Sequence, residues 1–388
     1  MRILIAPSGY KEGLQAEEVC AAIAQGVRSG CPDADVVEMP LADGGEGTSS
    51  TLARITGGQM RHLSVTGPLG TAVDSYFALL GGQEGPLTAV VELAAAAGLR
   101  HVPLGRRNPL RTTSRGVGEL ILAAIDAGAK RILIGCGDSG VNDGGAGMAA
   151  ALGIGLLGRD GTPIEPTGAG LADLHTITRD KLDPRLGGVE LLTACNVKNV
   201  LTGPNGVARL FGPQKGASPQ DVEALAQALD HYSVVIEAAT GVDVRDVPGG
   251  GASGGAGAAL YALLGAQLVS RFELLFPYFP VDEEIGQADL VITAEGGLDY
   301  KTARGKIPAE IGERGAAAGV PVIVLAGTLG ERAETVLKHG VCAFFSTVGK
   351  PESLEEAMAC AHDEIAVVAE HVLRTFLAGA ALGRKHRG

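Results

Sequence analysis

Four glycine-rich clusters carry or adjoin the acids and lysines that are best suited to chemistry. They are DGGEG at 43–47, NDGGAG at 142–147, GPNGVARLFGPQKGA at 203–217 and GGGASGGAG at 249–257. Three of them place glycines where helices are expected to begin, and a helix N-terminus offers free N–H groups that bind phosphate or carboxylate. Asp beside such a loop can hold Mg²⁺, and a lysine can neutralise phosphate charge. The pattern predicts transfer of a phosphoryl group from a nucleotide to a small hydroxylated substrate.

Other well-known catalytic motifs are missing or lack their structural context. The sequence has no G-x-x-x-x-G-K-[ST] loop and no kinase H-R-D or D-F-G set. A G-x-G-x-x-G match at 249–254 and a G-x-S-x-G match at 251–255 both fall inside a glycine run that no clear strand precedes. Neither Ser253 nor Ser139, which has no His near it in sequence, is therefore predicted to be a nucleophile.

Composition limits the partners and the compartment. The net charge of −12 argues against nucleic acid as a partner, because such sites need a basic field. The six cysteines form no CxxC pair, which indicates neither a zinc site nor a disulfide framework and suits the cytoplasm. No basic region followed by a long apolar run marks a signal peptide, and no uninterrupted apolar run of about 18 residues predicts a membrane span.

Short apolar strands alternate with amphipathic helices along the chain, which predicts an α/β fold with a parallel sheet. The clearest strands are expected at 2–6, 36–39, 90–93, 131–135, 189–194, 290–293, 322–326 and 342–346. The clearest helices are expected at 16–27, 117–127, 222–239, 308–318, 331–338 and 354–376. The last third repeats the style of the opening units. We therefore predict one domain built from residues 1–65 and 285–388, with residues 66–284 inserted as a second α/β domain.

The motifs together resemble the bacterial glycerate kinase family, in order and over nearly the whole chain. The resemblance rests on ADGGEGT at 42–48, RRNPL at 106–110, GVGELILAA at 116–124, NDGGAGM at 142–148, GPNG at 203–206, FGPQKGA at 211–217, ADLVIT at 288–293 and GVPVIVLAG at 319–327.

This resemblance implies phosphorylation of D-glycerate, usually at the 2-hydroxyl, with ATP as the donor and Mg²⁺ as the metal. It also implies that the discontinuous domain is Rossmann-like and that the active site lies in the cleft between the two domains. The expected partners are ATP and the hydroxylated substrate, with a homodimer as a further expectation and no membrane partner.

The sequence departs from the family pattern in four motif loops. Ser8 stands where the family usually has Asp, and the segment 137–143 reads GDSGVND where the family reads GGSATND. Asn196 replaces an Asp and has no base capacity near neutral pH. Gly297 replaces an Arg, which removes a fork that binds carboxylate or phosphate.

These departures leave three functions open. The first is an ordinary glycerate kinase. The second is a kinase of the same family that acts on a polyol, cyclitol or sugar acid. The third is a non-catalytic ligand-binding relative. In the second case, Asp138, Tyr10 and Glu12 would recognise hydroxyl groups.

The predicted site residues fall into three roles. The catalytic candidates are Asp43, Asp143, Asp299 and Lys11. The metal-ligand candidates are Asp43 and Asp143. The candidates for binding substrate or phosphate are Gly44, Gly45, Glu46, Ser139, Asn142, Asn196, Lys215, Glu295 and Lys306.

Overall fold

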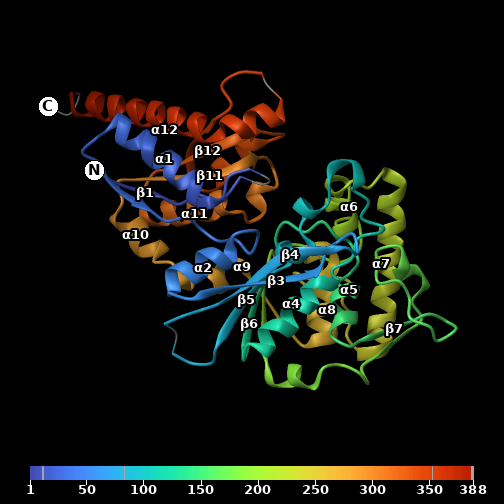
Figure 1. Cartoon of the computed structure of the whole chain (residues 1–388). Helices are drawn as coiled ribbons and strands as arrows, with labels where there is room; N and C mark the ends of the chain where they lie inside the picture. Colours follow the sequence, from blue (N-terminus) through green and yellow to red (C-terminus); the bar gives the residue numbers. More distant parts are fainter. Residues whose placement is uncertain (11–12, 83, 352, 386–388) are drawn as a thin grey trace. The chain divides into compact units, whose positions relative to one another are not determined.

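The contacts between residues in a computed structural model divide the chain into two α/β units. The structure describes residues 1–10, 13–82, 84–351 and 353–385. Unit 1 combines Met1–Ala42 with Phe279–Gly388, so both chain ends belong to it (Figure 1). Unit 2 is the continuous segment Asp43–Tyr278.

Unit 1 is built on a five-stranded sheet in which every strand pair is parallel, in the order β13-β12-β11-β1-β2. The strands are β1 (Arg2–Ile5), β2 (Asp35–Glu38), β11 (Leu290–Leu298), β12 (Val322–Leu329) and β13 (Val341–Ser346). The predicted strands at 2–6, 36–39, 290–293, 322–326 and 342–346 all lie within one or two residues of these at their starts. A parallel sheet needs apolar strands because helices cover its faces.

Helices cover this sheet. They are α1 (Ala16–Gly30), α10 (Val281–Gln287), α11 (Ile307–Ala318) and α12 (Leu354–Lys385). Figure 1 shows α1 and α12 running side by side, and a Cβ on Gly26 would overlap the Ala366 carbonyl oxygen, so glycine permits this close packing. The predicted helix at 331–338 is the 3-10 helix η8 (Ala333–His339).

Helix α12 is unusually apolar. Residues Glu355–Leu382 are long and apolar enough to cross a membrane by length and composition alone. Their charged residues break the run, which is why no uninterrupted apolar stretch is visible in the sequence. Ile365, Ala369 and Leu373 are buried in the core of unit 1, where α12 contacts α1. Within unit 1, 28% of the most apolar window of this helix is buried.

Unit 2 is built on a six-stranded mixed sheet in the order β10-β9-β6-β5-β4-β3. The strands β5 (Thr88–Glu92), β6 (Arg131–Gly135), β9 (Glu190–Cys195) and β10 (Gln267–Ser270) are parallel. The strands β3 (Gln59–Thr66) and β4 (Ala72–Leu79) add an antiparallel hairpin that the sequence patterns did not predict. A separate antiparallel pair consists of β7 (Gly155–Leu157) and β8 (Thr176–Thr178).

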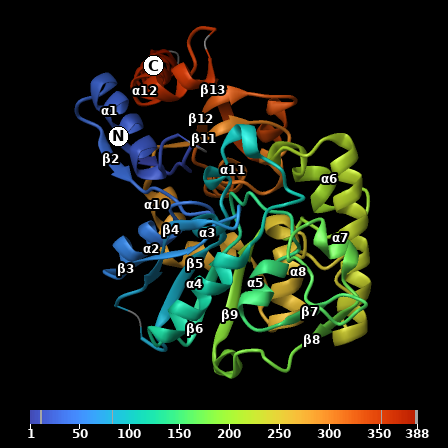
Figure 2. The ribbon, with the colours of Figure 1, turned by 45° about the vertical axis from the view of Figure 1, so that its right-hand side comes forward.

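The helices of unit 2 begin at several of the glycine clusters. They are α2 (Thr48–Thr56), α3 (Leu93–Ala97), α4 (Arg115–Asp126), α5 (Ala146–Ala151), α6 (Val207–Phe211), α7 (Pro219–Thr240), α8 (Ala252–Leu264) and α9 (Arg271–Leu275). Gly47 and Gly145 directly precede α2 and α5, which confirms these two predicted helix starts. At the start of α8, Ser253, Gly254 and Gly255 have left-handed backbone angles, so the regular helix begins only after the kink that they form. Figure 2 shows α5, α7 and α8 gathered together, and their contacts agree.

The division between the units differs from the predicted boundaries near 65 and 285. Strand β3 pairs with β4, and α2 packs on β3, β4 and β5. Residues 43–65 therefore belong with the second sheet, and the predicted boundary at 65 falls inside unit 2. The second boundary lies at 278/279, a few residues before the predicted position.

Candidate active site

The parallel strands of unit 2 bring most of the predicted residues to one edge of its sheet. Parallel strands end at the same edge, where ligands bind in open α/β sheets. Ser139 and Asn142 follow β6, Asn196 follows β9, and Arg271 follows β10. The loop 43–47 lies against this edge, because Gly137 N–H donates to the Gly44 carbonyl oxygen at 2.8 Å.

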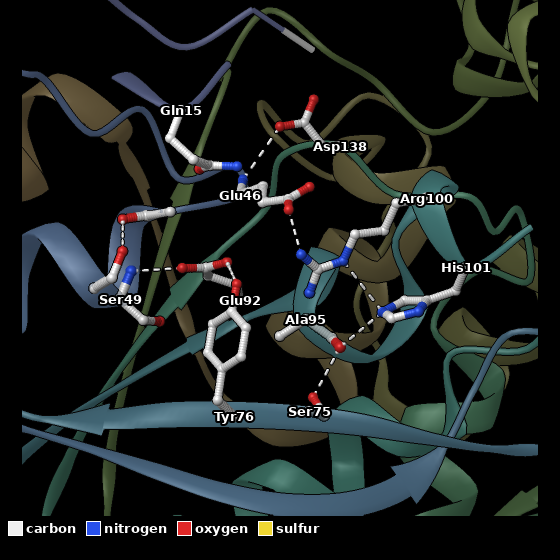
Figure 3. A network of polar contacts seen from close by, with 12 residues as sticks. Gln15, Glu46, Ser49, Ser75, Tyr76, Glu92, Ala95, Arg100, His101 and Asp138 are labelled. Atoms are coloured by element: carbon white, nitrogen blue, oxygen red, sulfur yellow. Dashed lines mark hydrogen bonds and ion pairs between the residues drawn. The ribbon is translucent and has the colours of Figure 1, made fainter. Parts of the chain in front are cut away.

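Close backbone approach explains the glycines of the loop 43–47. A Cβ on Gly45 would overlap Asp138 Oδ2, and a Cβ on Gly137 would overlap Gly45. Asp138 Oδ2 also accepts the Glu46 N–H at 3.2 Å (Figure 3), and Asp138 itself has a φ of +50°. The side chain of Asp138 therefore holds the loop, which differs from the expected role in recognising a substrate hydroxyl.

Both acids of the loop are paired with arginines. Arg271 Nη1 lies 3.0 Å from Asp43 Oδ2, and Arg100 pairs with Glu46. The Arg271 side chain is only 12% exposed, while Asp43 is 32% exposed. Sequence patterns missed both arginines, since Arg271 is 228 residues from its partner and follows a strand that was not predicted. The two cations place positive charge on either side of the loop.

Lys215 is buried and braces the segment that follows β6. Its Nζ donates to Ser139 Oγ at 3.1 Å and to the Val141 carbonyl oxygen at 2.6 Å. The structure thus brings Lys215 and Ser139 together, with the ammonium bonded to groups of the protein, and their predicted role in binding substrate or phosphate stays a prediction. Asn142 is fully buried next to this segment.

Asp143 is enclosed by hydrogen-bond donors of the protein. Such surroundings differ from those expected for its predicted role as a metal ligand or base. It is fully buried, and its carboxylate accepts the N–H groups of Ser114, Gly145 and Gly147 together with the Ser114 hydroxyl. Burial raises the pKa of Asp143, and these hydrogen bonds oppose the rise. The carboxylate fixes the start of α5 and is not presented to a ligand.

A second group of predicted residues lies at the end of β11 in unit 1. Glu295 accepts hydrogen bonds from Thr302 and, at 3.0 Å, from Lys306 Nζ. Burial raises the pKa of Glu295, while the Lys306 charge acts in the opposite direction. Asp299 Oδ1 accepts the Lys301 N–H at 2.7 Å. The Lys306 side chain as a whole is 30% exposed.

The structure shows which groups lie next to the residues that depart from the family pattern. A Cβ on Gly297 would lie 3.3 Å from Thr328 Oγ1, a tight contact that requires a small shift of this hydroxyl. Asn196 Oδ1 accepts the Lys198 N–H at 3.0 Å and closes a local turn. Ser8 Oγ donates to the Ala294 carbonyl oxygen at 2.9 Å. Tyr10 is buried in the core of unit 1, and burial raises its pKa, so it is a packed aromatic and not an exposed hydroxyl-recognising group.

Lys11 and Glu12 lie outside the described residues, so their predicted roles stay predictions. Within the part of the chain that the structure describes, no group of three or more His, Cys, Asp or Glu side chains forms a metal cage. Asp43 is the predicted ligand whose exposure suits a metal bound partly through phosphate oxygens, which is how Mg²⁺ is usually held. Asp143 does not suit that role.

One buried acid at the same edge was missed by the sequence patterns. Glu92, the last residue of β5, is fully buried and accepts the Ser49 N–H at 2.5 Å and the Tyr76 hydroxyl at 3.2 Å (Figure 3). Burial raises the pKa of Glu92 to about 7, although its hydrogen bonds with Ser49 and Tyr76 and the charge of Arg100 work against the shift. In the sequence, Glu92 is a single acid inside the otherwise apolar run VVELAAAA, and no motif around it indicates a function.

Comparison with known proteins gives one consistent result. The glycerate kinase family model matches residues 3–377. The chain is 45% identical to "Glycerate 2-kinase" of Escherichia coli strain K12, covering 98% of this chain and 99% of that protein. It is 44% identical to "Glycerate kinase" of Bacillus subtilis strain 168, covering 92% and 93%. A crystal structure described as a putative glycerate kinase 2 from Salmonella typhimurium LT2 is 44% identical, with a TM-score of 0.76 and coverage of 98% and 99%.

Proposed function

The chain belongs to the glycerate kinase family, and we propose that it transfers the γ-phosphoryl group of ATP to the 2-hydroxyl of D-glycerate. The observation that carries this proposal is the similarity to a glycerate 2-kinase over 98% of the chain. The family motifs at 43–47 and 211–217 are intact in the sequence, and the structure places Asp43, Glu46 and Lys215 in unit 2.

Charge and positioning can supply most of the catalysis. Phosphoryl transfer depends mainly on alignment and on neutralising the charge that builds up on the phosphate oxygens. In unit 2, the N–H groups of residues 44–46 all donate to side chains of the protein, which fixes the loop 43–47, and Lys215 keeps the neighbouring segment in place. In unit 1, Lys306 carries an ammonium that pairs with Glu295, on a side chain that is 30% exposed.

Asp43 would hold Mg²⁺ together with phosphate oxygens of the nucleotide. When bound, Mg²⁺ neutralises phosphate charge and orients the phosphoryl group. Binding at Asp43 would require its carboxylate to share or exchange its contact with Arg271.

The substrate proton needs an acceptor with base capacity. Asn196 has none, and Asp143 is buried under four hydrogen bonds. Asp43 and Asp299 remain as acceptors for the hydroxyl proton, with Lys11 as a further phosphate contact.

A second candidate function is phosphorylation of a different hydroxylated molecule, such as a polyol, cyclitol or sugar acid. The observation that favours it is Gly297, which stands where the family pattern has Arg. Loss of a carboxylate-binding fork is consistent with an acceptor that carries no carboxylate at that point.

Purified protein, ATP and Mg²⁺ should be incubated with D-glycerate while ADP release is followed. Turnover with 2-phosphoglycerate as the product, identified by ³¹P NMR, supports the proposal. ADP release only with a member of a polyol and cyclitol panel supports the second candidate. No binding of ATP by calorimetry would contradict both kinase functions and leave a non-catalytic relative.

The finer architecture and location belong to the same proposal. We propose that unit 1, with its five parallel strands, is the Rossmann-like domain of the enzyme. We also propose that the protein works in the cytoplasm, with ATP and a small hydroxylated molecule as its partners and without nucleic acid or membrane. Assembly into a homodimer stays a prediction.

A further inference from the structure

Glu92 connects three separate elements of unit 2 at the edge where the loop 43–47 lies. Its Oε1 accepts the N–H of Ser49, in the first turn of α2. Its Oε2 accepts the hydroxyl of Tyr76, which comes from β4. Helix α2 begins directly after the loop 43–47, so the hydrogen bond between Glu92 and Ser49 also restrains the end of that loop.

A second line of contacts runs from Tyr76 to the loop itself. The guanidinium of Arg100 lies over the Tyr76 ring, 5.7 Å from its centroid, within range of a cation–π interaction. The same guanidinium pairs with Glu46, and the Glu46 N–H donates to Asp138 (Figure 3). Glu92 is thus tied to the loop through Ser49 on one path and through Tyr76 and Arg100 on the other.

We propose that ionised Glu92 is a positioning residue that holds the loop 43–47 in its ligand-binding form through Ser49, Tyr76 and Arg100. This rests on the proposed function insofar as the loop serves the phosphoryl transfer. Glu92 itself is fully buried and is argued to act only through the residues that it holds.

The donors around Glu92 explain why the charged form is the active one. An ionised carboxylate only accepts hydrogen bonds, and both Ser49 N–H and Tyr76 O–H donate. Charge-assisted hydrogen bonds are roughly twice as strong as neutral ones. Protonation therefore weakens the hold on α2.

The groups that face Glu92 set the pH at which this happens. They are Ser49 from α2, Tyr76 from β4, and the charges of Arg100 and Glu46 near the Tyr76 hydroxyl. Since burial raises the pKa of Glu92 to about 7, the loop is held firmly above this pH and is loosened below it.

The test compares pH profiles of kcat/KM for the wild type and four variants, Glu92→Gln, Glu92→Asp, Tyr76→Phe and Glu119→Gln. The wild type should lose activity as pH falls through about 7, by up to about tenfold per pH unit. E92Q should show no such inflection and should lie about tenfold below the wild type at pH 8. E92D keeps the charge and should keep an inflection. Y76F removes one donor and should shift the inflection to higher pH.

Glu119 supplies the matched control. It is another carboxylate of unit 2 that accepts a backbone N–H and a hydroxyl, both from Thr66. E119Q makes the same chemical change away from the loop and should leave the inflection where it is. An unchanged inflection in E92Q, or its equal loss in E119Q, would overturn the proposal.

A measurement without catalysis separates this proposal from the proposed function. Hydrogen exchange of the backbone amides in residues 43–52 should be faster in E92Q than in the wild type at pH 8, and unchanged in E119Q. A wild type that does not turn over D-glycerate contradicts the proposed function, and the exchange rates still decide the role of Glu92. If E92Q fails to fold, the exchange in Y76F decides, and wild-type protection there would overturn the proposal.

Discussion

At the scale of single residues, one arginine of the family pattern is missing from this chain, and two arginines pair with acids of the loop 43–47. The family position occupied by Gly297 has lost its Arg, while Arg100 and Arg271 pair with the two acids of the loop 43–47. These pairs lie in unit 2 and Gly297 lies in unit 1.

Restoring the missing Arg is a direct test of the acceptor. In Gly297→Arg, the new Cβ lies 3.3 Å from Thr328 Oγ1, so this hydroxyl must move by a few tenths of an ångström. We expect KM for D-glycerate to fall about tenfold, which corresponds to about 1.4 kcal/mol, because an Arg–carboxylate pair is charge-assisted. Steady-state kinetics with D-glycerate would measure it, and Gly297→Met controls for added bulk. A rise in KM in both variants would favour an acceptor without a carboxylate.

Asp143 should behave as a structural residue. Asp143→Asn replaces an acceptor of four hydrogen bonds with a group that also donates, which leaves donors facing donors in a buried site. We expect a loss of about 2–4 kcal/mol in the free energy of unfolding, measured by denaturant titration. Ser114→Ala, which removes only one of these donors, should cost about 1 kcal/mol. A D143N protein of normal stability but without activity would restore the predicted catalytic role.

At the scale of elements, the loop 43–47 depends on the backbone of the segment after β6. Gly44 and Gly137 are hydrogen-bonded through their backbones, and Gly45 lies where any side chain would collide with Asp138. The element that matters is therefore the pair of loops, each shaped by the other. Neither loop alone would show this in sequence.

Gly45→Ala should displace the loop while leaving the rest of unit 2 folded. A misplacement of about 1 Å costs up to about 100-fold in rate, so we expect kcat/KM to fall 10- to 100-fold. Gly187→Ala is the matched control, because nothing lies within 4 Å of a Cβ at that position. Full activity in G45A would show that the loop tolerates the displacement and does not position the substrate.

At the scale of the whole molecule, the buried acid Glu92 makes stability depend on pH. A carboxyl whose pKa rises from 4.5 to about 7 on folding stays protonated in the folded state over that range. Its stabilising contribution is present below pH 4.5 and is lost as pH rises through about 7. The size of the effect is about 3 kcal/mol.

Glu92→Gln should remove this dependence. From pH 5 to pH 8, the thermal midpoint of the wild type should fall relative to that of E92Q, because only the wild type must bury a new charge. Differential scanning calorimetry at both pH values measures the two midpoints, and E119Q should follow the wild type. Parallel behaviour of the wild type and E92Q would show that Glu92 does not titrate in this range.

Sequence patterns predicted every parallel strand except β10, because each of the others contains a clear apolar run. The strand β6 was placed at its observed bounds, 131–135, and α4 within two residues of its start. The hairpin β3–β4 was not predicted, because exposed positions interrupt both strands and leave no continuous apolar run. The predicted boundary at 65 was misplaced for the same reason. For the site, the sequence motifs identified the loops. Glu92, Arg100 and Arg271 were identified only from the structure, because the residues that they contact are far away in the sequence.

The insertion of unit 2 into unit 1 has a consequence for synthesis on the ribosome. Strand β1 is bonded on one side to β11, which ends at residue 298, so the first sheet cannot close until most of the chain has been made. Every strand of the second sheet lies before residue 271. The inserted unit can therefore complete its sheet first, while the opening 42 residues wait for their partners.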